Sequence, residues 1–387
     1  MTTKEKIIYA GFKQLLKTPF DSVSVNGIAK TVGISKPAIY KHFKSKEQIF
    51  KEMQTCFFNE LISYLHKSDI SFQNISEHTC FDRLESLAFV HFFCEHPGYL
   101  NYFIRELIYD KNFETSFQNF FIKEKIISPD FFCKNKEQFL SIKNEDYLKI
   151  VFRISTVNCF ISEMHSYLEQ NNLQMPSDFP DKVFDLVKTG WKKLNPISKE
   201  RMQELESIVT SSKVVSEPSS KFFIAVADVV NEYGFQGLTM EKIASKMGLA
   251  VSTLYAHYDN KNELVQNVVV DEINKAIIQC SKARGSIIDF SESVYVQLQS
   301  IGMYLFAHPS SLKVFRWFRS LNFLENNNQE KSFMSLSNEK DFPNKFYAIW
   351  IHTIPVSINT QGYAHGVSKE ELIQAIRNAY GYMVSGV

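Results

Sequence analysis

The chain has 387 residues, of which 44% are hydrophobic and 22% charged, and its formal net charge is +1. That length favours two or more domains, and the composition excludes a disordered, collagen-like or disulfide-dense protein. No segment has the apolar length of a membrane span or a signal peptide, so we expect a cytoplasmic protein whose six cysteines are mostly buried thiols.

The first residues of the chain predict a bundle of short helices. Thr2 and Glu5 form a capping box before an apolar pattern of helical period, which should end near Thr18. Ser24 can cap a second helix. Gly33 should end that helix, because glycine readily takes the left-handed backbone found at many helix ends.

A short turn then leads into a third helix. Ser35 can cap it, and Pro37 lies in its first turn, where the missing amide proton is tolerated. We expect this helix to end near Phe43, and Ser45 and Gln48 to form a capping box at the start of a long fourth helix. Two helices joined by a short turn that contains glycine are the signature of a helix–turn–helix.

This whole arrangement occurs twice. Residues 28–50 align without a gap with residues 243–265, at a constant shift of 215. Four identical pairs mark the register: Gly33 and Gly248, Tyr40 and Tyr255, His42 and His257, and Lys46 and Lys261. A repeat of this length indicates one supersecondary plan used twice rather than a solenoid of short units.

The remaining segments also predict helices. The longest lie at residues 146–170, 181–194, 263–283, 290–306 and 369–384, with another at 340–362 that Pro355 should interrupt. We predict five regions: a helix–turn–helix domain at 1–50, a helical regulatory domain at 51–195, a linker at 196–218, a second helix–turn–helix domain at 219–265 and a second regulatory domain at 266–387. The linker includes a polar amphipathic helix at 199–209 and is long enough to cross a domain-sized distance.

The two copies differ in charge. Residues 1–52 hold ten lysines and four carboxylates, a net charge of +6, whereas residues 218–267 hold four lysines and five carboxylates, a net charge of −1. Three matched positions contribute to this charge difference. Where the first copy has Lys36, Lys41 and Lys44, the second has Val251, Ala256 and Asp259. Because each neutralised phosphate adds to DNA affinity through counterion release, the second copy should bind DNA more weakly or read a different half-site. We therefore expect an asymmetric operator, the alternative being that the second copy does not bind DNA.

The third helix of each copy carries the residues that would contact DNA. A helix in the major groove offers its N-terminal side chains to base edges, while flanking groups bind phosphates. The candidate base-edge residues are Lys36, Ala38 and Lys41 in the first copy and Val251, Ser252 and Thr253 in the second. Lys46 and Lys261 lie in the first turn of the next helix, where the helix dipole and free amides favour an anion.

Both copies share a further set of features: the pairs Ile28–Ala29 and Ile243–Ala244, the glycine in the turn, and the closing segments Tyr40–Lys46 and Tyr255–Lys261. On these residues both copies resemble the TetR family of bacterial repressors. The resemblance implies an all-α fold of two TetR-like halves, each with an N-terminal helix–turn–helix three-helix domain and a C-terminal helical domain of the ligand-binding and dimerisation type. Because family members usually dimerise through their last two helices, two fused halves resemble a covalent pseudo-dimer.

The resemblance also implies phosphate contacts for the tyrosines and histidines of the third helix and the turn after it. The full predicted DNA-binding set is Ser24, Ser35, Lys36, Ala38, Tyr40, Lys41, His42, Lys44 and Lys46 in the first copy, and Thr239, Val251, Ser252, Thr253, Tyr255, His257 and Lys261 in the second.

The regulatory segments are rich in aromatic residues, and the chain contains 34 phenylalanines. Aromatic stripes at helical spacing are usually core, but in the resembled family some of them line a cavity for a small apolar or aromatic molecule. The candidate ligand-binding residues are Tyr102, Phe103, Asn158, Phe160 and Met164 in the first half, and Trp317, Tyr347, Trp350 and His352 in the second. For each of them core packing is the alternative interpretation.

These patterns predict a sequence-specific DNA-binding transcriptional regulator, by resemblance a repressor, acting as a monomeric pseudo-dimer or as a homodimer of fused chains. Its expected partners are a double-stranded DNA operator and a small apolar or aromatic effector. The sequence shows no phosphate-binding glycine loop, nucleophile elbow, catalytic carboxylate pair or metal-ligand spacing, so we predict no enzyme activity, cofactor or metal. The alternative is a small-molecule-binding helical protein or an enzyme in which one or both helix–turn–helix units are structural only.

Overall fold

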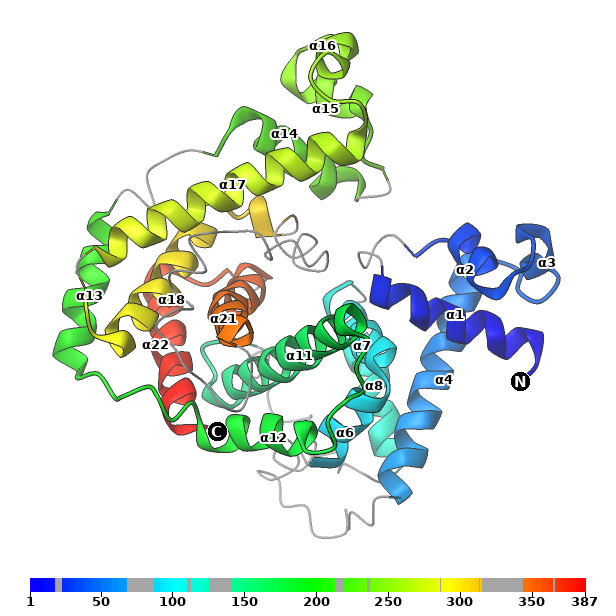
Figure 1. Ribbon diagram of the computed structural model, residues 1–387, viewed down its shortest axis with the longest axis horizontal. Coiled ribbons are helices and arrows are strands. Elements are labelled where there is room, and N and C mark those ends of the chain that lie inside the picture. The colour runs from blue at the N-terminus through cyan, green and yellow to red at the C-terminus, as the bar shows by residue number, and fades with distance from the viewer. Residues whose placement is uncertain are drawn as a thin grey trace. The chain divides into compact units, whose positions relative to one another are not determined.

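A computed structural model describes residues 1–17, 23–67, 87–109, 113–124, 141–212, 219–234, 237–285, 287–312, 314, 344–364 and 366–387. Within these residues the regular elements are helices and none is a strand, which confirms the predicted all-α class (Figure 1). The chain divides into two compact units: unit 1 comprises residues 1–138 and 160–184, and unit 2 comprises residues 139–159 and 185–387. None of the described helices is long and apolar enough to cross a membrane.

Unit 1 begins with four helices: α1 (Thr3–Lys17), α2 (Val25–Val32), α3 (Lys36–Tyr40) and α4 (Lys46–Lys67). We call α1, α2, α3 and the first turns of α4 head 1. Its core consists of apolar side chains that recur at helical spacing: Ile7, Phe12, Leu15, Val25, Ile28, Ile39, Phe43 and Ile49. Removing these side chains from water is the main force that holds such short helices together, since helices of this length are marginal on their own.

The remainder of unit 1 is an aromatic helical bundle. It contains α6 (Leu87–Glu95), α7 (Pro97–Tyr109), α8 (Phe113–Lys123), the second half of α11 (Glu145–Asn171) and the first half of α12 (Phe179–Thr189). Phe57 of α4 lies among the rings of Phe92, Tyr99 and Tyr102, with centroid separations of 6.3, 5.8 and 5.7 Å. Aromatic pairs at these distances add to the stabilisation from burial alone.

Head 1 is packed against α7. The ring of Phe12 in α1 lies 4.4 Å from that of Tyr99 and 5.3 Å from that of Tyr102, both edge-on. Gly98 permits this approach, because a Cβ at that position would lie 2.8 Å from the carbonyl oxygen of Phe12. A movement of α7 would therefore be transmitted directly to α1.

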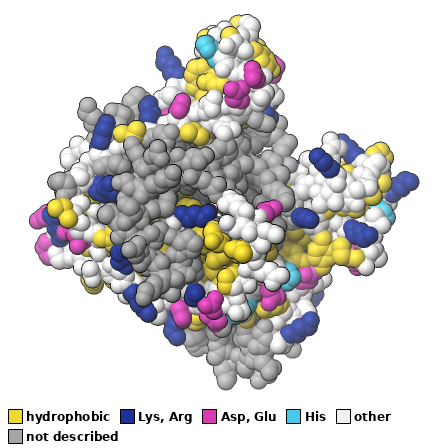
Figure 2. Space-filling model, in the orientation of Figure 1, with side chains coloured by type: hydrophobic (Ala, Val, Ile, Leu, Met, Phe, Trp, Pro, Cys, Tyr) yellow, Lys and Arg dark blue, Asp and Glu magenta, His cyan; other side chains and the backbone are white. Residues whose placement is uncertain are grey.

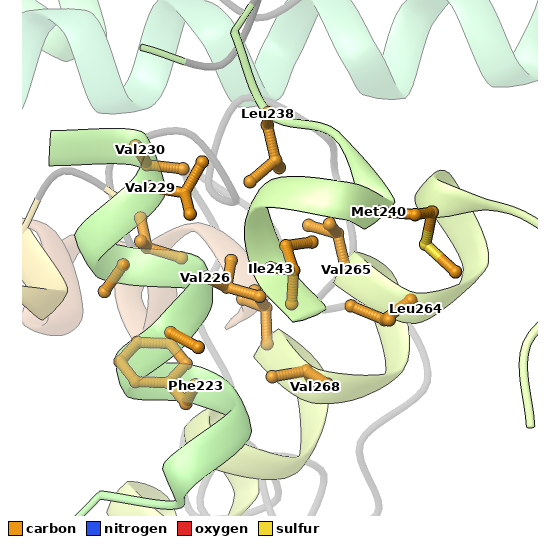
Figure 3. Packing of buried hydrophobic residues seen from close by; sticks show 14 of the residues in the cluster. Phe223, Val226, Val229, Val230, Leu238, Met240, Ile243, Leu264, Val265 and Val268 are labelled. Carbon is orange, nitrogen blue, oxygen red and sulfur yellow. The ribbon is translucent and has the colours of Figure 1, made fainter. Parts of the chain in front are cut away.

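Unit 2 contains the second copy as α14 (Lys221–Tyr233), α15 (Met240–Met247), α16 (Val251–Tyr255) and α17 (Lys261–Arg284). We call α14, α15, α16 and the first turns of α17 head 2. Figure 3 shows its core, which is mostly aliphatic and includes Phe223, Val226, Val229, Val230, Leu238, Met240, Ile243, Leu264, Val265 and Val268. The same cluster includes Val314, which lies outside head 2, so the core of head 2 is continuous with the rest of unit 2.

The remainder of unit 2 joins α13 (Lys199–Ser211), α18 (Phe290–Ala307), α21 (Asn344–Ala364) and α22 (Lys369–Ser385) with the first half of α11 and the end of α12. The indole Nε1 of Trp350 in α21 donates a 2.8 Å hydrogen bond to Oγ1 of Thr156 in α11, and both residues are fully buried. Phe152 of α11 packs edge-on against Tyr382 of α22 at 5.5 Å. Segments from both halves of the sequence thus share one core.

The helix predicted within the linker is α13, and it packs against other helices of unit 2. Arg201 of α13 forms two 2.8 Å hydrogen bonds to the carboxylate of Glu292 in α18. Glu206 of α13 accepts hydrogen bonds of 2.7 to 3.1 Å from Arg377 in α22. Because paired guanidinium and carboxylate groups fix geometry as well as charge, α13 has a defined position in unit 2.

Two predicted helix ends differ from the structure. The third helix ends at Tyr40 rather than near Phe43, because the chain turns there and inserts the Phe43 ring into the core of head 1. The helix predicted for residues 181–194 ends at Thr189, because Gly190 adopts a left-handed φ of +74°. A Cβ on Gly190 would lie 2.5 Å from the carbonyl oxygen of Val384, so the contact with α22 requires glycine.

The predicted interruption at Pro355 was wrong, since α21 continues through this residue. Proline costs a helix one hydrogen bond and a steric clash. Here Ile354 and Ile358 on either side are completely buried, and Asn359 Nδ2 donates a 2.9 Å hydrogen bond to the Pro355 carbonyl. Tertiary packing therefore outweighs the local preference of proline.

Candidate nucleic-acid interface

The local structure of head 1 follows from three capping residues. Oγ of Ser24 accepts a 3.0 Å hydrogen bond from the Gly27 amide at the start of α2. Gly33 ends α2 with φ +78° and ψ +30°, the left-handed conformation expected there. Oγ of Ser35 accepts a 3.4 Å hydrogen bond from the Ala38 amide at the start of α3. Both serines, which we predicted to contact DNA, use their hydroxyl groups within the fold as helix caps.

One face of α3 is anchored and the opposite face is exposed. Ile39 is completely buried, and residues two positions away on a helix lie about 200° round the axis. Pro37 and Lys41 therefore lie on the outermost side, and both are exposed. Tyr40 beside them is 43% exposed. Lys36 and His42 are also exposed, whereas Ala38 is half-buried, so most of the predicted contact residues share one accessible surface.

The exposed lysines of this surface are available to an external anion. Lys36, Lys41 and Lys44 form no salt bridge with any residue in the described ranges. Lys46 is half-buried and lies over the ring of Phe50 at 5.4 Å from its centroid. In Figure 2 the surface over α2 and α3 carries several basic side chains with few acidic neighbours. This is the charge distribution that a phosphate backbone requires.

Head 2 repeats the backbone of head 1. Oγ1 of Thr239 accepts a 3.3 Å hydrogen bond from the Lys242 amide and caps α15, which ends at Gly248 with φ +67° and ψ +29°. The start of α16 differs, because its N-cap position is Ala250, which offers no side-chain hydrogen bond. Leu254 takes the completely buried place that Ile39 has in head 1.

The outer surface of α16 is uncharged. Ser252 and Ala256 lie opposite the buried Leu254 and are exposed, as is Thr253. Tyr255 is 52% exposed and His257 is exposed, so these two residues match their counterparts in head 1. The predicted base-edge residue Val251 is half-buried and packs against the core of head 2, and Lys261 is half-buried at the start of α17.

The lysines of α15 are engaged within head 2. Nζ of Lys242 donates a 2.8 Å hydrogen bond to the Gly237 carbonyl and lies 3.9 Å from the ring centroid of Tyr233. Lys246 forms a 2.7 Å salt bridge with Glu232, a pair that lowers the pKa of the carboxyl and raises that of the ammonium. Figure 2 accordingly shows acidic and hydrophobic side chains among the basic ones over α15 and α16.

The start of the long helix repeats this contrast. In head 1 the Gln48 amide donates to Ser45 Oγ at 3.3 Å, and Gln48 Oε1 accepts from the Lys44 amide at 2.6 Å. In head 2 the Glu263 amide donates to Asn260 Oδ1 at 3.0 Å, and Glu263 Oε2 accepts from the Asp259 amide at 2.8 Å. The two heads thus make the same pair of hydrogen bonds with different charges. Head 1 uses the neutral side chain of Gln48 next to Lys44, and head 2 uses the carboxylate of Glu263 next to Asp259.

The residues predicted to bind a ligand lie mostly in packed cores. In unit 1, Tyr102, Phe103, Phe160 and Met164 are buried. In unit 2, Tyr347 stacks on Trp191 at 4.3 Å, Trp350 is buried, and Asn158 and His352 are half-buried. Nε2 of His352 lies 3.4 Å from the amide nitrogen of Gln297. Trp317 lies outside the described residues, and ligand binding by the whole set stays a prediction.

Sequence reasoning missed a buried polar network in unit 2. Glu206 accepts a hydrogen bond from the hydroxyl of Tyr295 as well as those from Arg377, and Gln299 Nε2 donates to the same hydroxyl at 3.0 Å. Burial, with the hydrogen bond to Glu206 second, raises the pKa of the Tyr295 phenol well above its ordinary range. Tyr295 lies 89 positions and Arg377 lies 171 positions from Glu206 along the chain, so no local sequence pattern indicates this network.

The geometry described so far defines a class of protein, namely a helical protein with two helix–turn–helix heads in one chain. Residues 7–53 and 225–268 each match the model of the bacterial regulatory proteins of the tetR family. These segments are the two heads, so each head has the N-terminal, DNA-binding fold of that family, and the chain carries this fold twice. The resemblance seen in the sequence is thereby confirmed.

Two solved structures show a weaker similarity. A TetR-family transcriptional regulator from Haemophilus influenzae has 16% identity, with coverage of 46% of this chain and 96% of that chain and a TM-score of 0.34. A candidate transcription regulator from Lactobacillus plantarum has 23% identity, with coverage of 41% and 96% and a TM-score of 0.32. None of the curated proteins matches the chain.

Proposed function

We propose that the protein is a sequence-specific DNA-binding transcriptional regulator that represses its target and is adjusted on its operator by a small apolar or aromatic molecule. One chain supplies both reading heads, as an intramolecular pseudo-dimer. The observation that carries the proposal is the pair of exposed recognition surfaces, in which Tyr40 and Tyr255 lie at the same register next to an exposed histidine. Recognition helices of this kind enter the major groove while neighbouring groups bind phosphates.

Free cations support DNA as the partner of head 1. Lys36, Lys41 and Lys44 are exposed and unpaired within the described ranges, whereas the lysines of α15 in head 2 are engaged. Each phosphate neutralised by a free lysine releases a condensed counterion. The logarithm of the DNA affinity therefore falls by roughly 0.9, per phosphate contacted, for each tenfold rise in salt concentration. A structural helix–turn–helix would have no need of this cluster of unpaired charge.

Contacts within unit 2 support the pseudo-dimer. Residues of α11 and α12, from the first half of the sequence, pack against α21 and α22 from the second half. Besides the bonds of Trp350 and Phe152, the Trp191 amide donates a 2.6 Å hydrogen bond to the Met383 carbonyl, and the Tyr147 hydroxyl donates at 2.9 Å to Gln361. In the TetR family, which the sequence resembles, chains usually dimerise through their last two helices, and here the last helices of the two halves contact each other within one chain.

Contacts within unit 1 support a route from an effector to head 1. Tyr102, a predicted ligand-binding residue of α7, lies 5.3 Å from Phe12 of α1 and 5.7 Å from Phe57 of α4. A ligand that displaces the Tyr102 ring would therefore press on α1 of head 1 and on α4, the helix whose first turns belong to head 1. Because close-packed cores transmit such displacements, operator affinity would change with ligand binding.

The first test is DNA binding by the purified full chain, measured by fluorescence anisotropy on DNA from its own upstream region at several salt concentrations. Tyr40→Ala and Tyr255→Ala are compared with Tyr→Phe variants, which keep the ring. We expect steep salt dependence and loss of affinity in both alanine variants. Loss in Tyr40→Ala alone would assign reading to head 1, and salt-independent or absent binding would contradict the proposal and favour structural helix–turn–helix units.

Effector control and stoichiometry need separate measurements. Apolar and aromatic compounds that raise the melting temperature would be tested for their effect on operator affinity at fixed salt, and unchanged affinity would contradict the regulatory step. Light scattering of the free chain and of the DNA complex should show one chain per operator. Two chains per operator would replace the pseudo-dimer by a homodimer of fused chains.

A further inference from the structure

The two recognition surfaces differ at a matched position on the side of the helix that faces away from the core, occupied by Lys41 in head 1 and Ala256 in head 2. We propose that the heads read half-sites that differ at the corresponding base pair, with a guanine facing Lys41 and a thymine facing Ala256. This inference rests on the proposed function and adds the chemistry of the bases that each head selects.

The backbone presents the two side chains in the same way. Lys41 has φ −72° and ψ −23°, and Ala256 has φ −70° and ψ −19°. Each follows a completely buried anchor by two residues, Ile39 in head 1 and Leu254 in head 2. At about 100° per residue, both side chains project from the side of the recognition helix farthest from that anchor. They therefore occupy equivalent places relative to DNA docked on either head.

The chemistry at Lys41 selects guanine. Its ammonium group is a donor without acceptor capacity, and within the described ranges no carboxylate pairs with it. In the major groove guanine presents two acceptors, O6 and N7, whereas adenine presents one acceptor beside an amino donor, which opposes an ammonium group. A lysine on the groove-facing side of a recognition helix thus favours guanine.

The chemistry at Ala256 selects thymine. Its exposed methyl group can pack on the C5 methyl of thymine and has nothing to offer to the acceptors of guanine. The neighbouring outward residue is Ser252, whose hydroxyl tolerates either kind of base. The lysines of α15 do not replace the missing cation, because Lys242 is bound to the Gly237 carbonyl and Lys246 to Glu232.

The alternative role for Lys41 is a phosphate contact. A lysine on phosphate weakens binding to every sequence equally when it is removed, whereas a lysine on a base edge changes which sequence is preferred. The two roles are therefore separated by the selected sequence and not by affinity alone. Lys44, which precedes the long helix α4, serves as the matched phosphate-type control.

The experiment is selection from a random double-stranded DNA library by the full chain, followed by sequencing of the bound fraction. The parent should enrich a two-part site with guanine in one half and thymine at the matching position of the other, each preferred by roughly tenfold. Lys41→Ala should abolish the guanine preference and leave the other half unchanged, and Lys41→Arg should retain it. Ala256→Lys should convert the thymine to guanine. Lys44→Ala should lower affinity without altering either half.

Two results would overturn the inference while leaving the proposed function intact. One is a parent site with the same base at both matching positions. The other is a Lys41→Ala variant that loses affinity for all sequences with its preference unchanged, which would place Lys41 on phosphate. Failure of the parent chain to enrich any sequence would overturn the proposed function itself and this inference with it. Because both positions are exposed, circular dichroism should show every variant folded like the parent.

Discussion

Head 1 and head 2 share their interior and differ in their surface. Ile28 and Ile39 are buried in head 1, and Ile243 and Leu254 take the same places in head 2. The turn glycines have nearly the same backbone angles in both. The exposed positions differ in charge, hydrogen-bond capacity and partners. A core is constrained by volume and the turn by backbone conformation, so both are retained, while the exposed residues are constrained only by what they bind.

The strongest test of the shared interior is a matched pair of core truncations. Ile28→Ala and Ile243→Ala should each destabilise the head that contains them by about 2 to 5 kcal/mol, because each leaves a cavity in a packed core. Hydrogen exchange should show loss of protection in α2 and α3 for the first variant and in α15 and α16 for the second. Loss of protection in both heads after one truncation would show that the heads do not unfold separately.

The charge difference should appear next, in the salt dependence of DNA binding. Replacing Lys36, Lys41 and Lys44 together by alanine should reduce the slope of log affinity against log salt by roughly 2 to 3. The control change on the recognition helix of head 2, Ser252→Ala with Thr253→Ala, removes hydroxyls but no charge and should leave the slope unchanged. Equal slopes for both variants would remove the electrostatic distinction between the heads.

A smaller effect is expected at the start of the recognition helices. Ser35 caps α3 through a side-chain hydrogen bond, whereas Ala250 leaves α16 without one. Ser35→Ala should destabilise head 1 by about 1 kcal/mol, and Ala250→Ser should stabilise head 2 by a similar or smaller amount. Chemical denaturation followed by hydrogen exchange in the recognition helices would measure both. A destabilising Ala250→Ser would mean that the backbone at this position does not suit a serine cap.

A separate prediction concerns the long helix α4, which carries a thiol at Cys56. Burial, followed by the charge of Glu60, raises the pKa of Cys56 from its ordinary 9.0 to about 11, and burial raises that of Cys94 to about 12. Both groups stay neutral at pH 8, so iodoacetamide should modify Cys56 roughly a hundredfold more slowly than an exposed cysteine. The rate should rise as the pH approaches 11. Fast modification at pH 8, mapped by mass spectrometry, would contradict this environment.

The sequence predicted the parts of the fold that depend on neighbouring residues. The caps at Ser24 and Ser35 and the turn at Gly33 were predictable, because each acts on an amide or a backbone angle within a few positions. The register of the repeat then transferred these assignments to Thr239 and Gly248 in head 2. Most of the predicted base-edge residues are exposed, but Ala38 and Val251 are half-buried.

Other features depended on distant residues and were not predictable. The continuation of α21 through Pro355 results from burial of its neighbours, and the end of α12 results from the close approach of Gly190 to Val384. Lys246 of α15 pairs with Glu232, a residue on another helix. Pairing of this kind decides whether a lysine can bind an external anion, and a single sequence does not show it.

The matched backbones at Lys41 and Ala256 have a consequence for how such a protein can change over time. In an assembly of two identical chains, one codon specifies both recognition surfaces, so every substitution appears twice. In this chain each surface has its own codons. Under the proposed function, a mutation in one half of a target site can therefore be answered by a substitution in one head, while the other head and its half-site are left as they were.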